Sequence, residues 1–187
     1  MMMIGDYAIR HEQSSLRASV IQRFAKQCPA FIETGSNVGA GIQEALTAGF
    51  EMVYSVEGLK AFYDICYQKY SSNPRVQLYC GYSPDILKEI LLNLDKPAVI
   101  YLDAHSIAHN PLLEELKVIR DISDGAVECG HPFKHVIMID DVRMFDTADW
   151  HGIKRSEAIA LLRSIYTLYN ISYVDTINAR GDLLVAC

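Results

Sequence analysis

Four chemically reactive side chains follow two apolar segments of the chain. The segment YLDAHS places Asp103 and His105 directly after one segment, and IMIDDVRMF places Asp140 and Asp141 after the other. If both segments are neighbouring parallel strands, these side chains meet at one edge of a sheet. Such a cluster of acids repels itself unless a cation compensates it. Oxygen ligands suit Mg²⁺ or Ca²⁺ rather than Zn²⁺, so the sequence predicts a metal site at Asp103, Asp140 and Asp141.

A structural role for the same acids stays open, because acids at strand ends are often solvated or cap the following helix. Asn110 and Pro111 already form a strong helix start, so Asp103 is not needed as a cap. The residues after Asp141 show no strong helix start, which also weakens the capping explanation. His105 is a candidate general base, because the unperturbed pKa of histidine, about 6.5, lies close to working pH.

A glycine-spaced turn follows an earlier apolar segment, in the stretch FIETGSNVGAGIQ. The dinucleotide pattern G-x-G-x-x-G fails here, because Asn37 occupies its second glycine position. The spacing that fits is E-x-G-x-N-x-G, with Glu33, Gly35, Asn37 and Gly39, since Asn tolerates a left-handed backbone. Glu33 would repel a phosphate and attract a cation. S-adenosylmethionine (SAM) carries an ammonium and a sulfonium and no phosphate, so it is the predicted ligand.

The order of elements along the chain predicts how these residues are positioned. Short apolar runs alternate with helical patterns, which favours parallel strands joined by crossover helices. The expected strands cover residues 29–33, 52–57, 76–80, 98–103, 135–140, 171–177 and 182–186. The expected helices cover residues 14–28, 38–48, 59–70, 83–94, 110–122 and 156–169. The prediction is an α/β fold with a doubly wound, mostly parallel twisted sheet and a C-terminal antiparallel hairpin.

The motifs in this order resemble a known family. FIETGSNVGAGIQEALTAGFEMVYSVE looks like the first two motifs of class I, Rossmann-like SAM-dependent methyltransferases. VQLYCGYSPDIL is similar to the third motif and AVIYLDAHS to the fourth. Within that class the chain is most similar to the branch of FkbM-type enzymes, macrocin O-methyltransferases and cephalosporin-hydroxylase relatives. The resemblance implies a single SAM-binding domain over residues 1–187, with residues 1–29 as an N-terminal helical segment.

The resemblance also implies which residues bind the cofactor. The glycine turn would hold the methionine moiety, Glu57 the ribose, and the segment from Gly81 to Ser83 the adenine. The implied cofactor-binding residues are Glu33, Thr34, Gly35, Ser36, Asn37, Gly39, Glu57, Gly58, Gly81, Tyr82, Ser83 and Asp103. The family often has Asp at the position of Tyr82, where it would bond the adenine amino group. Here either Tyr82 stacks on the ring or Ser83 supplies the polar contact.

These observations favour a metal-assisted, SAM-dependent O-methyltransferase acting on a small hydroxylated molecule or a sugar. In the macrocin-type branch, acids at positions matching Asp103, Asp140 and Asp141 bind Mg²⁺, which would lower the pKa of a substrate hydroxyl. Asp103 and His105 are the implied catalytic residues, with His105 taking the proton. Two alternatives stay open: a metal-dependent hydroxylase-like enzyme on the same scaffold, and a non-catalytic SAM-binding module. An all-carboxylate site speaks against iron, which would want two histidines.

An acceptor pocket has little chain to draw on outside the core fold. Only the N-terminal helix and the loops at residues 121–135 and 142–156 are available to form it. We therefore expect either that a second subunit of a homodimer completes the pocket or that the acceptor is large.

Composition excludes several other classes of protein. The chain has 187 residues, 50% of them apolar, which suits one compact domain. Its 17 basic and 23 acidic residues give a net charge of −6, which disfavours nucleic acid as a partner, although some nucleic-acid enzymes confine their basic residues to one face. The five cysteines form no CxxC pair, and the N-terminus does not resemble a signal peptide. No apolar run reaches the roughly 20 residues of a membrane span, so we expect a cytoplasmic protein without membrane contact.

Overall fold

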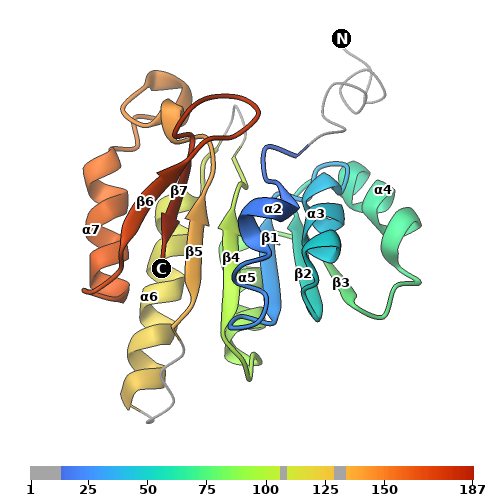
Figure 1. Ribbon diagram of the computed structural model, residues 1–187. Helices are drawn as coiled ribbons and strands as arrows, with labels where there is room; N and C mark the ends of the chain where they lie inside the picture. Colours follow the sequence, from blue (N-terminus) through green and yellow to red (C-terminus); the bar gives the residue numbers. More distant parts are fainter. Residues whose placement is uncertain (1–13, 106–108, 129–133) are drawn as a thin grey trace.

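The computed structural model describes residues 14–105, 109–128 and 134–187, which are built around one seven-stranded sheet (Figure 1). The strand order is β3-β2-β1-β4-β5-β7-β6. The strands are β1 Ala30–Thr34, β2 Met52–Glu57, β3 Val76–Cys80, β4 Ala98–Leu102, β5 Val136–Ile139, β6 Ile171–Val174 and β7 Leu183–Ala186. The first five are parallel, whereas β7 is antiparallel to both β5 and β6. The predicted sheet and its closing hairpin are therefore confirmed.

Helices cover both faces of the sheet (Figure 1). One face carries α2 Ala18–Ile21, α3 Ala40–Ala48 and α4 Lys60–Tyr70; the other carries α5 Ser83–Leu92, α6 Leu112–Glu128 and α7 Arg155–Ile165. Two apolar cores follow from this arrangement: Ile100 of β4 packs towards α5, α6 and α7, and its neighbour Val99 packs towards α2, α3 and α4. Every residue of β1, β4, β5 and β7 is buried, which explains the uninterrupted apolar sequences of β4, β5 and β7 and the apolar start of β1.

The parallel strands end at the upper edge of the sheet in Figure 1. Their alignment continues one residue beyond the strands, because the amide of Asp103 donates to the carbonyl of Thr34 and the amide of Asp140 donates to that of Leu102. The chain order reverses between β1 and β4, where consecutive crossovers leave in opposite directions. The end of such a sheet next to this reversal is where α/β folds bind ligands.

The predicted N-terminal helix over residues 14–28 is wrong for most of its length. Only Ala18–Ile21 is α-helical, and the next backbone bond, from Phe24 to the carbonyl of Ile21, spans three residues instead of four. The hydroxyl of Ser15, near the start of this segment, bonds Tyr101 and Asp140, and no side chain caps α2. Burial of Ile21 and Phe24 holds the segment on the sheet instead.

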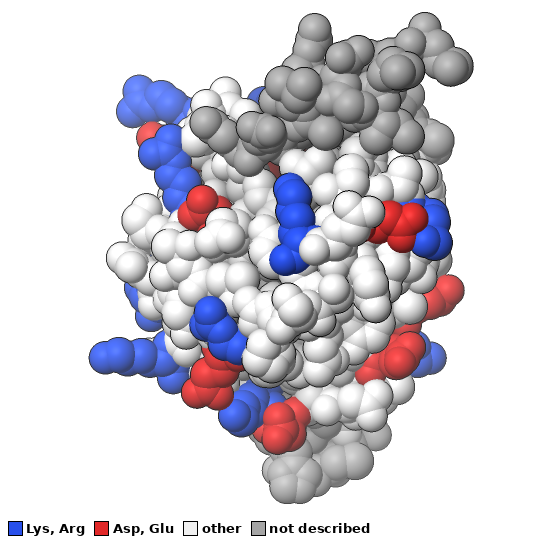
Figure 2. Space-filling view, turned by 90° about the vertical axis from the view of Figure 1, so that its right-hand side faces the viewer, with Lys and Arg blue, Asp and Glu red and all other residues white. Residues whose placement is uncertain are grey.

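The surface on the side of β3 and α4 shows no broad area of a single charge (Figure 2). In this view Lys and Arg stand singly among Asp, Glu and uncharged residues. No helix in the described ranges has both the length and the apolar character that a membrane crossing requires.

Replacing glycines at the two ends of α3 separates backbone strain from steric overlap. Gly39 and Gly49 both have left-handed backbones, with φ of +85° and +91°. An added Cβ at Gly39 would lie 2.6 Å from a ring carbon of Tyr70, whereas at Gly49 it would meet nothing within 4 Å. We expect Gly49→Ala to cost about 1–2 kcal/mol of unfolding free energy through strain alone, and Gly39→Ala to cost about 1–3 kcal/mol more through overlap.

Urea unfolding of the two variants measures this difference. Equal losses for Gly39→Ala and Gly49→Ala would mean that the ring of Tyr70 moves aside at no cost, and would contradict the close packing of the turn.

Candidate functional site

The glycine turn after β1 has the backbone that its sequence predicts. Gly35, Asn37 and Gly39 all have positive φ, at +88°, +48° and +85°. An added Cβ at Gly35 would lie 2.5 Å from the carbonyl oxygen of Asp103, so the turn touches the end of β4 with no room for a side chain. Asn37 therefore does stand where the dinucleotide pattern has a glycine, as predicted from its tolerance of this backbone.

Side chains of α4 hold the outer side of the turn. The thiol of Cys66 donates to one carbonyl of residues 37–39 at 3.3 Å, the ammonium of Lys69 to the next at 2.8 Å, and the hydroxyl of Tyr70 to the third at 2.9 Å. These contacts fix three successive peptide groups without any ligand. The sequence did not reveal them, because the three donors lie about thirty residues beyond the turn.

Glu33 lies beneath the turn, in the interior. Its side chain is 1% exposed, and the hydroxyl of Ser55 donates to its Oε1 at 2.6 Å. Its other oxygen packs against the first turn of α3, where a Cβ added to Gly41 would approach it to 2.1 Å. Burial raises the pKa of Glu33 to about 8, and the charge of Glu57 contributes to the rise. A cation brought to this site would favour the ionised form of Glu33.

Glu57, at the end of β2, connects the turn to the next loop. Its Oε2 accepts a hydrogen bond from the amide of Asn37, and its Oε1 accepts one from the amide of Leu59, both at 2.8 Å. Burial raises the pKa of Glu57, although these backbone bonds act to lower it. The carboxylate predicted to bind a ribose is thus also a brace for the backbone of the glycine turn.

The remaining predicted cofactor residues form two groups, one in the glycine turn and one beside Glu57. Thr34 and Ser36 are buried in the turn, with the hydroxyl of Ser36 2.5 Å from that of Ser55. Next to Glu57, the amide of Gly81 donates to its carbonyl, and a Cβ on the exposed Gly58 would lie 3.8 Å from the carbonyl of Gly81.

Tyr82 and Ser83 begin α5 and differ strongly in exposure. The side chain of Tyr82 is 42% exposed, and its hydroxyl donates to Glu114 at 2.8 Å and bonds His109 at 2.9 Å. Ser83 is buried next to Glu115. The predicted adenine region thus contains one exposed and one buried residue.

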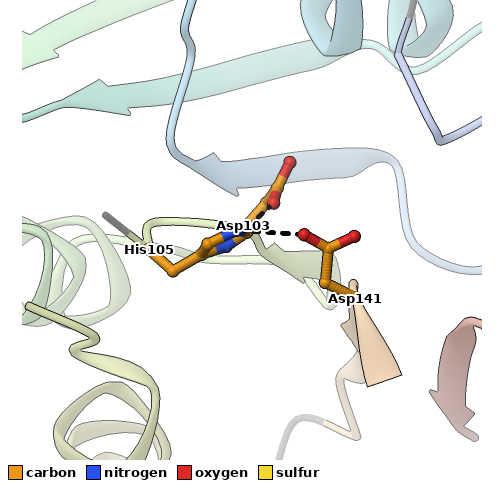
Figure 3. Close-up of side chains that lie close together, drawn as sticks. All are labelled: Asp103, His105 and Asp141. Carbon is orange, nitrogen blue, oxygen red and sulfur yellow. Dashed lines mark ion pairs between the residues drawn. The ribbon is translucent and has the colours of Figure 1, made fainter. Parts of the chain in front are cut away.

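Asp103, His105 and Asp141 converge from the ends of β4 and β5 (Figure 3). The Nε2 atom of His105 lies 2.9 Å from Oδ2 of Asp141, and its Nδ1 atom lies 3.5 Å from Oδ1 of Asp103. Both imidazole nitrogens thus face carboxylates. His105 can take a proton from a substrate only after one of these contacts is given up.

Asp140 points away from this group, towards the α2 side of the sheet. Its Oδ2 accepts a hydrogen bond from the buried hydroxyl of Tyr101 at 2.7 Å and another from the hydroxyl of Ser15. The hydroxyl of Tyr101 also lies 3.3 Å from Asp103, so this tyrosine connects two of the three predicted metal ligands. The Oδ1 atom of Asp140 is buried and has no hydrogen-bond partner among the described residues.

Asp141 also belongs to a second group, with Asp140 and Asp182. The guanidinium of Arg143 occupies this group: it bonds Asp141 at 2.6 Å and also bonds the fully buried Asp182. The predicted ligands Asp103, Asp140 and Asp141 are therefore neighbours, but each of the two groups that could hold an ion contains only two of them. Sequence reasoning missed Arg143 as an internal cation, although it stands two residues after Asp141.

The charges at this edge separate the pKa values of the three aspartates. Burial raises the pKa of Asp103 well above its usual range, and the charges of Asp140, Asp141 and Glu33 raise it further. Burial and the charge of Asp141 raise the pKa of Asp140. Burial also acts on Asp141, but hydrogen bonds and charge from His105 and Arg143 outweigh it and lower the pKa. Asp141 is thus the permanent anion of the cluster.

Two of the three segments considered for an acceptor pocket reach the site. The indole ring of Trp150, in η2 Ala148–Trp150, lies 5.6 Å from the ring of His105, so the loop after β5 packs on the acidic group. Ser15 brings the N-terminal segment to Asp140. Of the third segment, residues 121–135, the part up to Glu128 continues α6 instead of forming a loop, and His135 bonds the amide of Ala98 at the opposite edge of the sheet. Residues 129–133 lie outside the described residues.

Solved structures share this fold, whereas no protein-family model and no curated protein sequence matches the chain. The SAH-bound O-methyltransferase from Bacillus cereus aligns with 98% of this chain and 87% of its own, with a TM-score of 0.60 and 14% sequence identity. SAM-bound CalS10, an amino pentose methyltransferase from Micromonospora echinaspora, aligns with 99% and 91%, with a TM-score of 0.59 and 14% identity. The spermidine synthase from Thermotoga maritima aligns with 89% of this chain and 56% of its own, with a TM-score of 0.59 and 14% identity.

These similarities define the class of fold. The seven-stranded sheet with its reversed β7 is the Rossmann-like methyltransferase fold, as the sequence motifs predicted. Identities this low establish the fold alone, so the narrower FkbM-type and macrocin-type branch stays a prediction.

Glu33 makes the stability of the fold depend on pH. Because its pKa rises from 4.5 to about 8 on folding, the folded chain keeps a proton that the unfolded chain releases. Stability therefore falls as the pH rises from about 4.5 to about 8, and the full cost is present above this window. We expect the unfolding free energy of the wild type to fall more steeply than that of Glu33→Gln between pH 5 and 8, by about 1.4 kcal/mol per pH unit at most.

Urea unfolding at several pH values measures both slopes, and the variant subtracts the contribution of the other buried acids. Parallel pH profiles for wild type and Glu33→Gln would show that Glu33 does not hold a proton in the folded state.

Proposed function

We propose that the protein is a SAM-dependent methyltransferase. The observation that carries this proposal is the glycine turn: three left-handed residues, touching β4 and held between the carboxylates of Glu33 and Glu57. Acids on both sides of a turn disfavour phosphate and favour a cationic ligand. SAM carries two cations, an ammonium and a sulfonium, and solved structures with this fold include complexes with SAM and SAH.

The chain's own groups divide the tasks of binding. Glu33 lies beneath the turn, where it would face the positive charge of the methionine part of SAM. Its pKa is raised by burial, and the cation would lower it again and so favour the ionised carboxylate. Glu57 receives the ribose hydroxyls while it keeps the turn in place. The turn is braced by α4 in the absence of ligand, so little order has to be created on binding.

The finer proposal is metal-assisted transfer to an oxygen of a small hydroxylated molecule or a sugar. Asp103, Asp140 and Asp141 would hold Mg²⁺, because their donors are hard oxygens, Asp141 belongs to both acidic groups, and the buried Oδ1 of Asp140 lacks a donor among the described residues. Asp140 would have to turn towards Asp103 to share the ion, since the two acids lie in different groups. The ion, when bound, would lower the pKa of the acceptor hydroxyl. His105 would then receive the proton after it gives up one of its two carboxylate contacts, with the ring of Trp150 packed beside it at 5.6 Å.

Two alternatives make different demands on the same residues. An iron-dependent hydroxylase needs two histidines with one carboxylate, whereas the group at Asp103 and Asp141 includes one histidine among the described residues. A non-catalytic SAM-binding module needs the glycine turn but not the acidic group. Binding of SAM without turnover under all metal conditions would favour this module.

Calorimetric titration with SAM and SAH tests the cofactor proposal. We expect both to bind, and we expect Glu57→Gln to weaken both by about tenfold or more, because the charged acceptor for amide and ribose donors is lost. Glu51→Gln is the control, since Glu51 is an exposed acid beside β2 that pairs only with Lys96 among the contacts described. Absence of binding by the wild type would remove the proposal.

Titration with Mn²⁺, followed by its electron paramagnetic resonance signal, tests the metal separately. We expect Asp141→Asn to weaken Mn²⁺ binding by about tenfold or more, because Asp141 is common to both acidic groups. Asp124→Asn, at an exposed position late in α6, should leave the affinity unchanged. If Asp141→Asn and Asp124→Asn bind Mn²⁺ like the wild type, the metal proposal fails and the cofactor proposal stands.

A further inference from the structure

Glu115, in the first turns of α6, is a buried carboxylate that the proposed function does not use. It is 1% exposed and lies beside the side chains of Ser83 and Thr34, which act to lower its pKa, so it adjoins the start of α5 and the end of β1. Its Oε1 atom is inaccessible to solvent and has no hydrogen-bond partner among the described residues. Buried carboxylate oxygens almost always have a donor, so the missing donor points to a group that arrives with a ligand.

Two contacts join the start of α5 to α6 near this atom. The outer bridge runs from Tyr82 to Glu114, on the surface, with His109 beside it. In the interior, the buried Ser83 lies beside Glu115. Tyr82 and Ser83 are the residues expected next to an adenine. The hydroxyl of Tyr82 is already engaged by Glu114, whereas Oε1 of Glu115 is an acceptor with no hydrogen-bond partner among the described residues.

We propose that Glu115 determines the base specificity of the cofactor site: its Oε1 accepts a hydrogen bond from the exocyclic amino group of adenine. This inference rests on the proposed function, because it places the adenosyl group of SAM at the start of α5. Adenine brings the N–H donor that Oε1 lacks. Glu115 thereby takes the place of the aspartate that the family often carries where this chain has Tyr82.

The burial of Glu115 sets the conditions for this contact. Because Oε1 of Glu115 is inaccessible to solvent, side chains around it have to move before the base can reach it. Burial raises the pKa of Glu115 to about 7, with the charge of Glu114 contributing. Either protonation state of Glu115 keeps an oxygen lone pair for the amino group, so the contact does not depend on ionisation.

The test compares SAH with S-inosylhomocysteine, which carries an oxygen in place of the amino group, by calorimetry on the full chain. The wild type should bind SAH about tenfold or more tightly, because the inosyl oxygen would face an acceptor instead of supplying a donor. In Glu115→Gln the amide can turn either its oxygen or its NH₂ towards the base. The preference for SAH should therefore fall towards unity, mainly through tighter binding of S-inosylhomocysteine.

Glu114→Gln is the matched control, since it makes the same change one residue away in the outer bridge. It should change the affinities of both ligands by the same factor and leave their ratio as in the wild type. A structural role of Glu115 would likewise weaken both ligands alike, so the ratio separates recognition of the base from stability.

Three results would overturn the inference while the proposed function stands: equal affinity of the wild type for SAH and S-inosylhomocysteine, an unchanged ratio in Glu115→Gln, or a changed ratio in Glu114→Gln. Failure of the wild type to bind SAH at all would instead overturn the proposed function. If Glu115→Gln does not fold, Glu115→Asp withdraws the acceptor by one methylene. It should lose about tenfold in SAH affinity and little for S-inosylhomocysteine, and equal losses would contradict the inference.

Discussion

The site depends on close contact between backbone and carboxylates at the carboxyl ends of β1, β2 and β4. Gly35 touches the carbonyl of Asp103, Gly39 touches the ring of Tyr70, and Gly41 touches the carboxylate of Glu33. None of these contacts leaves room for a Cβ. The spacing of the glycines is therefore a packing requirement first, and the same packing is what brings a bare backbone turn within reach of acids from three strands.

Charge is the second constraint, because several acids share a poorly solvated edge of the sheet. The chain compensates them internally: Arg143 and His105 face Asp141, while hydroxyls of Tyr101 and Ser15 bond Asp140. Asp141, which faces Arg143 and His105, has a lowered pKa, whereas burial raises the pKa values of Asp103, Asp140, Glu33 and Glu57. A ligand with positive charge or N–H donors would compensate the acids at this edge of the sheet. The methionine part of SAM would do so at Glu33, and the amino group of adenine would do so at Glu115.

Two kinds of feature could be predicted from the sequence: elements with a regular apolar pattern, and backbone positions that few residue types tolerate. Uninterrupted apolar runs identify β4 and β5 because both faces of these strands are covered. Asn37 is recognisable as a left-handed turn residue because Asn tolerates that backbone. Long-range contacts leave no such pattern. Ser15 looks like a helix cap but bonds an aspartate 125 residues away, and Glu115 looks like an ordinary helix acid until its buried neighbours are known.

The central claim is that the cofactor lies on the glycine turn and reaches the start of α5. An amide-resolved NMR titration of the ¹⁵N-labelled protein with SAH tests it most directly. The account predicts the largest shift changes at the amides of residues 35–39, with further changes at residues 57–59 and 81–83. Shifts confined to the β6 and β7 edge, or no change at the turn under saturating SAH, would contradict it.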